Sequence, residues 1–204
     1  MTEEVTTEST EIPSEPKTRR IKKPENVLRT ILISIIAALF FLVLDLIQWP
    51  YTVIGLFRLG LAPALAVVAL IGAIKGPLAG FLTGYIGKML SDFVLSGAIV
   101  AFTLYGFAIG FLGLVVGLAS YDLTSGRSLV KMSVLSAIGL VFTALLTVVF
   151  GLFVEGIASI VSIGFQLLPM LTVGLPTVVL LTPLFARIWQ HIAYHSTEKS
   201  ETAE

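Results

Sequence analysis

The sequence predicts an all-α membrane protein, a bundle of six transmembrane helices. Of its 204 residues 56 % are hydrophobic and only 13 % are charged, whereas about a quarter of a soluble domain is charged. The mean hydropathy is +0.97. Apolar segments that approach the length of about 20 residues needed to cross a bilayer recur six times along the chain.

The six expected spans are separated by short polar or turn-forming segments. They cover residues 27–47, 61–74, 77–95, 102–120, 132–154 and 166–189. Residues 121–131 are expected to form a polar loop, and the segment before the last span could form a short interfacial helix. Prolines recur every seven residues in the last span and predict a kinked helix, which neighbouring helices can accommodate; they are Pro169, Pro176 and Pro183.

The two ends of the chain differ from its centre. Residues 1–26, first acidic and then basic, and residues 191–204 read as disordered cytoplasmic tails, because both are polar and lack an apolar core. If both termini are cytoplasmic, every lysine and arginine except Arg58 and Lys88 lies on the inner side. Because basic residues favour the cytoplasmic side, we expect a multi-pass protein of the cell membrane in this orientation.

Small residues mark one face of the third span. Gly80, Gly84, Gly87 and Ser91 fall within a narrow arc of a helix that turns about 100° per residue. Lys88 lies beside that arc. The fourth span repeats the pattern of glycines every three or four residues. Such faces let two helices approach closely in lipid, so we expect dense packing or parts that slide.

Five ionisable residues fall at a similar depth in the outer half of the predicted bundle: Asp45, Arg58, Lys88, Asp92 and Glu155. Charges within spans usually face the protein interior or a wet cavity. We therefore expect a common hollow beneath the outer face that binds a small polar molecule. Lys88 and Asp92, four residues apart, could instead only neutralise each other, and Asp45 and Glu155 could be solvated helix ends.

Four further residues are candidates for ligand contact at the same level: Trp49, Tyr51, Tyr85 and Gln166. Each has a plainer interpretation. Aromatic residues populate membrane interfaces in any case. Tyr85, like Tyr105, could be an ordinary packing residue with a satisfied hydroxyl.

Several classes of function are disfavoured by missing motifs. The chain has no cysteine, and it contains no Walker lysine pattern and no HExxH motif, so we expect neither an enzyme nor an ATPase, and no cofactor or metal. His191 and His195 have the spacing of a metal pair without a third ligand in view. The basic run at residues 19–23 is short and marks topology while attracting anionic lipid, so we expect no nucleic acid as a partner.

Residues 58–94, RLGLAPALAVVALIGAIKGPLAGFLTGYIGKMLSDFV, followed by a glycine-rich fourth span, resemble the substrate-binding S components of energy-coupling factor (ECF) vitamin transporters. The resemblance covers roughly residues 28–190. It implies a six-helix protein that captures a vitamin or related small molecule near the outer surface. Such a protein passes its ligand inward while docked to a transmembrane coupling protein and two cytoplasmic ATPase subunits.

The resemblance also assigns roles to particular residues. It implies a ligand beneath the loop that joins the first two helices, here with Trp49, Tyr51 and Arg58. It implies a coupling contact through small residues of the first helix, here Ser34, Ala37 and Ala38. Lys88 stands where relatives tend to carry histidine, so the sequence does not name the substrate.

Two other functions remain open from the sequence. The chain could be a stand-alone secondary carrier or channel that dimerises through its glycine faces, although the inner halves of its spans contain almost no ionisable residue to form a path. It could also be a structural membrane protein in which Lys88 and Asp92 are internal staples.

Overall fold

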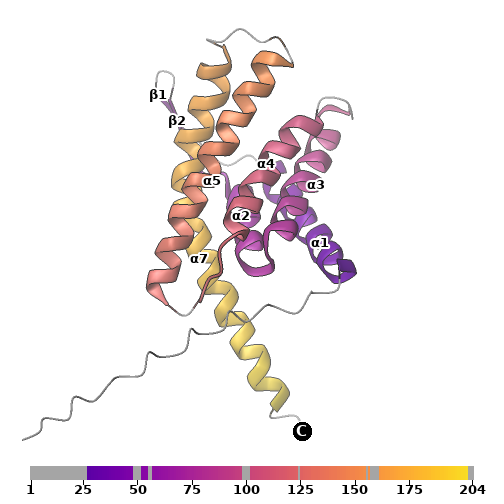
Figure 1. The fold of residues 1–204 in the computed structure, drawn as a ribbon, viewed down its shortest axis with the longest axis vertical. Helices are drawn as coiled ribbons and strands as arrows, with labels where there is room; N and C mark the ends of the chain where they lie inside the picture. Colours follow the sequence, from indigo (N-terminus) through magenta and orange to yellow (C-terminus); the bar gives the residue numbers. More distant parts are fainter. Residues whose placement is uncertain are drawn as a thin grey trace, which may run out of the picture.

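The computed structural model describes residues 27–47, 52–54, 57–97, 102–123, 125–154, 156 and 161–201. Within them the chain is all-helical apart from one small hairpin (Figure 1). The elements in chain order are α1 (Val27–Leu46), β1 (Thr52–Ile54), β2 (Phe57–Leu59), α2 (Pro63–Lys75), α3 (Pro77–Ser96), α4 (Phe102–Gly117), α5 (Gly126–Phe153), the π-helix η1 (Ser162–Leu167) and α7 (Leu168–Glu201).

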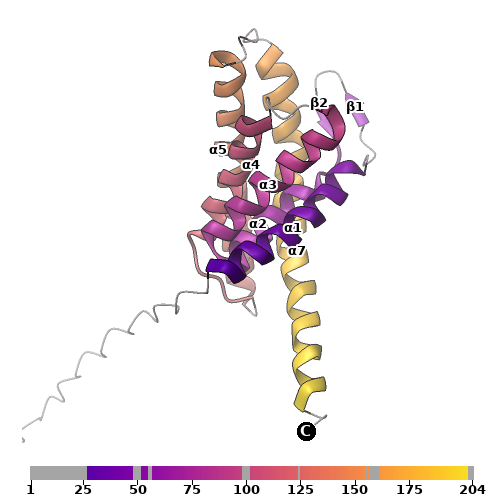
Figure 2. The same ribbon diagram turned by 90° about the vertical axis from the view of Figure 1, so that its right-hand side faces the viewer.

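The six-helix prediction is confirmed, with two helices shorter than a full span. Among the described residues, four helices are long and apolar enough to cross a membrane. In contrast, α2 has 13 residues and α4 has 16, fewer than the roughly 20 that a straight crossing needs. In Figure 2 α2, α3 and α4 lie together beside the long helices α5 and α7. The two short helices are therefore packed among longer neighbours.

Two helix ends differ from the sequence prediction. The fifth helix begins at Gly126 instead of residue 132, within the expected polar loop. Leu129 explains the difference, because its side chain is 7 % exposed and belongs to an apolar cluster with Met132 of the same helix. The last helix continues to Glu201, through residues expected to be a disordered tail. That segment contains no glycine or proline that would end a helix.

The last helix begins with a π-helical turn, Ser162–Leu167. Pro169 follows directly and has no backbone N–H to donate into the preceding turn, which accounts for a local change in hydrogen bonding. Pro176 and Pro183 lie inside α7, as predicted from the proline spacing of seven residues. Isolated π turns occur frequently at functional sites.

The core of the bundle takes large side chains from five helices. Phe41 of α1, Val68 of α2, Leu112 of α4, Leu140 of α5 and Val178 of α7 are all nearly or fully buried in one cluster. Many other leucines, isoleucines and valines are exposed on the outside. This arrangement is expected of a protein whose surroundings are lipid.

Glycines set the distance between α3 and α4. A Cβ atom added at Gly80 would lie 2.5 Å from the Gly113 carbonyl oxygen, and one at Gly84 would lie 2.8 Å from Gly110 Cα. Both distances are below the closest approach that real Cβ atoms show. The small residues of α3 do not all face α4. A Cβ atom at Gly87 would instead lie 2.7 Å from the Phe41 ring of α1.

The segment between α1 and α2 contains an antiparallel hairpin that the sequence did not predict. Thr52 pairs with Leu59 and Val53 with Arg58. The second strand packs against α7. Just after it, the Ala62 backbone N–H donates to Thr177 Oγ1 at 2.9 Å, which fixes the start of α2 to α7.

At the opposite end, Tyr121 anchors the loop between α4 and α5. Its hydroxyl donates to the Val116 carbonyl oxygen at 2.9 Å, and the Lys131 ammonium lies 5.6 Å from the ring centroid. Burial raises the pKa of Tyr121 to about 12, because it disfavours the phenolate. The phenol therefore remains a donor at neutral pH.

We expect Gly80→Ala to destabilise the protein, because the added methyl group must displace the backbone of α4 at Gly113. Overpacking of this kind costs about 1–3 kcal/mol. Thermal unfolding of the purified protein in detergent measures the effect. Gly126→Ala is the matched control, because a Cβ there meets nothing within 4 Å. A Gly80→Ala protein as stable as the control would contradict the close contact.

Candidate functional site

Four residues form a stripe along α3 beside its glycine face. Phe81, Tyr85, Lys88 and Asp92 are spaced four, three and four residues apart. At about 100° per residue they fall within an arc of roughly 60°. The stripe is aromatic near the middle of the helix and charged toward its end.

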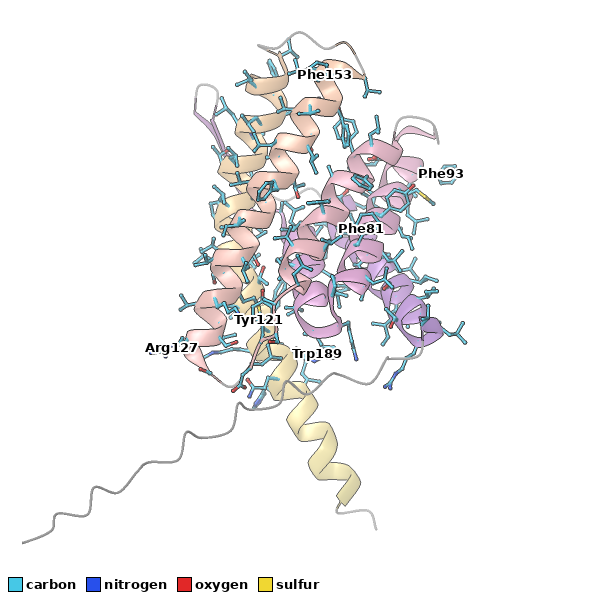
Figure 3. All side chains as sticks on the ribbon, in the orientation of Figure 1. Phe81, Phe93, Tyr121, Arg127, Phe153 and Trp189 are labelled. Carbon is cyan, nitrogen blue, oxygen red and sulfur yellow. The ribbon has the colours of Figure 1, made fainter. Side chains whose placement is uncertain are left out.

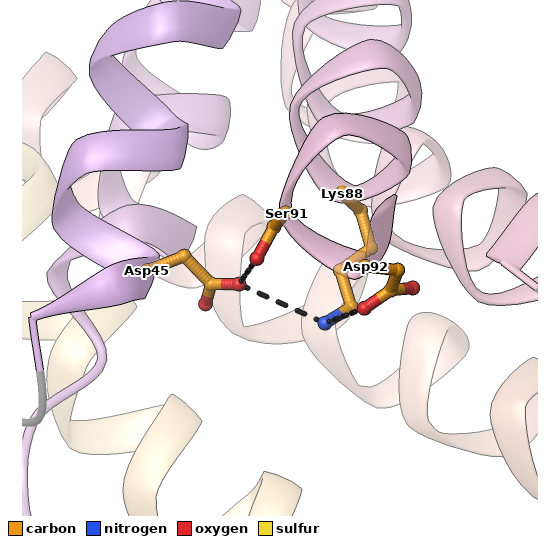
Figure 4. Close-up of polar contacts among 4 residues, drawn as sticks. All are labelled: Asp45, Lys88, Ser91 and Asp92. Carbon is orange, nitrogen blue, oxygen red and sulfur yellow. Dashed lines mark hydrogen bonds and ion pairs between the residues drawn. The ribbon is translucent and has the colours of Figure 1, made fainter. Parts of the chain in front are cut away.

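The charged end of the stripe meets α1 (Figure 4). Lys88 Nζ lies 2.7 Å from Asp92 Oδ1 and 3.7 Å from Asp45 Oδ2. The Ser91 hydroxyl donates a short hydrogen bond to the same Asp45 oxygen. The three ionisable side chains are 21–30 % exposed. Their formal charges sum to −1, so this polar cluster carries a net negative charge.

The sequence predicted that Asp45, Lys88 and Asp92 lie together, and the structure places them in contact. It did not predict the role of Ser91, which was counted only as a small residue of the packing face. The i, i+4 pair of Lys88 and Asp92 is also present as the plainer interpretation expected. The ion pair of Lys88 with Asp45 and the hydrogen bond of Ser91 to Asp45 thus link α1 to α3, within a set of polar groups.

A second group of polar atoms lies between α4 and η1. Gln166 Nε2 donates to the Tyr105 hydroxyl at 2.9 Å. The other amide atom, Gln166 Oε1, is buried and has no hydrogen-bond partner among the described residues. A buried acceptor without a donor is costly, so this oxygen is suited to receive a donor from a ligand.

Aromatic rings of α3, α4 and α5 pack against one another. The rings of Phe81 and Tyr85 are nearly parallel, 7° apart, with centroids separated by 6.0 Å. Phe107 of α4 meets Phe81 edge-on at 5.5 Å and lies 6.4 Å from Phe150 of α5. We call Phe81, Tyr85, Phe107 and Phe150 the aromatic wall. In Figure 3 Phe81 lies between the end marked by Phe153 and the end marked by Arg127.

The absence of a side chain at Gly106 lets Tyr85 of the aromatic wall approach α4 closely. A Cβ atom at Gly106 would lie 3.0 Å from the Tyr85 carbonyl oxygen and 3.4 Å from its ring. Tyr85 therefore packs directly on α4 next to Tyr105, the partner of Gln166. Tyr105, interpreted from the sequence as ordinary packing, instead accepts a hydrogen bond from Gln166.

The other predicted contact residues are not placed at this site. Trp49, Tyr51 and Glu155 lie outside the described residues. Arg58 is described only through the backbone of β2, where it pairs with Val53. Of the five charged residues expected to share a hollow, the structure thus describes the side chains of three, and the hollow itself stays a prediction.

The three residues predicted for a coupling contact are all buried, Ala37 at 7 % exposure. Ser34 and Ala38 are fully buried, and the Ser34 hydroxyl donates to the Thr30 carbonyl oxygen at 2.8 Å. Their side chains offer no surface to a partner, because α1 turns them toward α3. Ala37 instead borders a cavity of about 630 Å³, here called the inner groove. It is lined by Ile33, Ile36, Ala37, Phe40, Val67, Leu70, Ile71, Phe185, Ile188, Trp189 and Ile192.

Comparison with known protein families gives one match that spans most of the chain. The model of the family described as ECF-type riboflavin transporter, S component, matches residues 25–187. The match includes all four helices that bear the polar cluster and the aromatic wall.

We expect Lys88→Gln to lower the unfolding temperature, because Asp45 and Asp92 would lose their shared cation. The cost should be a fraction of the roughly 3–5 kcal/mol seen when one partner of a buried pair is removed, since these side chains keep some exposure. Thermal unfolding in detergent is the measurement. The double variant Lys88→Gln with Asp92→Asn should recover part of the loss. If Lys88→Gln unfolded at the same temperature as the unmodified protein, the polar cluster would not hold α1 against α3.

Proposed function

The chain belongs to the S components of ECF-type riboflavin transporters, and from this premise we propose that it binds a riboflavin-type substrate between α3, α4 and η1. An S component is the substrate-binding membrane subunit of such a transporter and is not an enzyme. We propose the substrate, the binding site and the partners of this chain on that basis.

The aromatic wall is the observation that carries the proposed site. A riboflavin-type molecule has a flat three-ring system with polar edges and a chain of hydroxyl groups. Flat rings stack on or meet the edges of aromatic side chains, as Phe81 and Tyr85 already do with each other. The buried Gln166 Oε1 can accept from a ring N–H, and carboxylates accept strongly from hydroxyl groups.

We further propose that both termini face the cytoplasm. Lys75, Arg127 and Lys131 lie at or near the ends of α2 and α5, and Arg187 lies in the second half of α7. All four belong to the same side in this orientation. Basic residues favour the cytoplasmic side of a membrane. The polar cluster then lies in the outer half, where a substrate arrives.

Energy for transport is proposed to come from partners, a transmembrane coupling protein and two cytoplasmic ATPase subunits. The chain carries no nucleotide-binding motif of its own. Of the three small residues proposed for coupling, Ala37 alone borders a cavity open to the outside of the bundle. We propose that the coupling protein docks along α1 at Ala37.

Riboflavin binding by the purified chain tests the proposed site. We expect quenching of flavin fluorescence on binding, without ATP. We expect Gln166→Leu and Tyr85→Leu to weaken binding by about tenfold or more, because a buried hydrogen bond or an aromatic contact is worth more than about 1 kcal/mol. Arg127→Gln, at an exposed position in the first turn of α5, is the matched control.

Two outcomes would contradict the site. Equal affinity of Gln166→Leu, Tyr85→Leu and the control would place the substrate elsewhere. Absence of binding to riboflavin and to its close analogues by a correctly folded protein would contradict the proposed substrate class.

Docking of the coupling protein is tested by co-purification. We expect Ala37→Trp to reduce recovery of the complex with the coupling module while riboflavin binding is retained, because the larger ring projects into the inner groove. Val141→Trp, at an exposed position of α5, is the control. Unchanged recovery of the Ala37→Trp complex would move the docking surface away from α1.

A further inference from the structure

The inner groove lies between α1, α2 and α7, and every residue that lines it is apolar. Its volume of about 630 Å³ is within the roughly 300–1,000 Å³ of small-molecule sites. An apolar cavity of this size on the membrane-facing side of a bundle is filled by hydrocarbon, because neither water nor a polar ligand finds a partner there.

The distance along α1 from Arg29 to the far end of the groove matches one leaflet of a bilayer. On α1 the lining residues run from Ile33 to Phe40, and Arg29 lies one turn before Ile33 on the same face. From Arg29 to Phe40 the helix rises about 16 Å, roughly half of a 30 Å hydrocarbon core. A partner helix would follow α1 over its whole length, whereas an acyl chain of one leaflet ends at the midplane.

Cations and an indole mark the cytoplasmic end of the groove in the proposed orientation. Arg29 is exposed at the first turn of α1. Lys75 closes α2 four residues after Ile71, which lines the groove. Trp189 lines the groove and is 47 % exposed, as is common for tryptophan at the level of lipid headgroups.

We propose that, when the coupling protein is not docked, the inner groove holds one acyl chain of an anionic phospholipid whose phosphate lies near Arg29 and Lys75. The acyl chain fills the apolar space, and the two cations select a negative headgroup, each basic group being worth about 1 kcal/mol at a membrane surface. The assignment to the inner leaflet rests on the proposed orientation. The coupling protein would displace this lipid at Ala37.

Quenching of Trp189 fluorescence tests the site directly. The chain has two tryptophans, so Trp49→Phe leaves Trp189 as the single reporter, and all comparisons are made in that background. The protein is placed in phosphatidylcholine vesicles containing equal fractions of brominated phosphatidylglycerol or brominated phosphatidylcholine. We expect brominated phosphatidylglycerol to quench about twofold or more strongly, and Arg29→Gln with Lys75→Gln to abolish that preference.

Controls separate the possible sources of the effect. Arg127→Gln removes an exposed cation away from the groove and should leave the preference unchanged. Excess soluble glycerol 3-phosphate should not relieve the quenching; if it does, the cations bind a free phosphate and the lipid proposal is overturned. Equal quenching by both lipids would indicate ordinary boundary lipid, and protection from both would indicate a second protein copy; either result overturns the proposal. Flavin binding is measured separately, so failure here leaves the proposed substrate untouched.

Discussion

The close contact of α3 with α4 determines where the functional groups of this protein lie. Helices in lipid gain little from the hydrophobic effect when they associate, so backbone approach through small residues takes its place. Gly80 and Gly84 hold α3 against Gly113 and Gly110. Because a helix rotates about its axis as one rigid body, that contact also fixes which way the stripe from Phe81 to Asp92 points. A change of rotation would turn the aromatic wall and the charged cluster away from their neighbours.

The small residues of α3 pack against two helices, α4 and α1. The packing that stabilises the bundle therefore also positions the proposed binding groups. Toward one end Gly87 meets Phe41 and Ser91 donates to Asp45, so α1 is held by packing and by a hydrogen bond together. Lys88 contributes to that staple and also belongs to the stripe. A structural role and a ligand-binding role are therefore compatible for these side chains. The cluster also carries a net negative charge, which favours donors such as the hydroxyl groups of a substrate.

Periodicity within one helix could be predicted from the sequence, and contacts between distant helices could not. The helical repeat alone placed Lys88 and Asp92 beside the glycine face and suggested the depth of Asp45. It could not show that Gln166 reaches Tyr105, 61 residues earlier, or that Gly87 faces α1 instead of α4. The coupling residues illustrate the same limit. Ser34, Ala37 and Ala38 look alike in sequence, yet only Ala37 borders an open cavity, because the rotation of α1 is set by its neighbours.

The most direct measurement of this account is an experimental structure of the full chain with riboflavin bound. The account predicts a flavin ring against Phe81 and Tyr85, with Gln166 Oε1 accepting a hydrogen bond from it, while α3 and α4 keep their glycine contact. A flavin that lies away from the α3 stripe and leaves Gln166 without a ligand donor would contradict it.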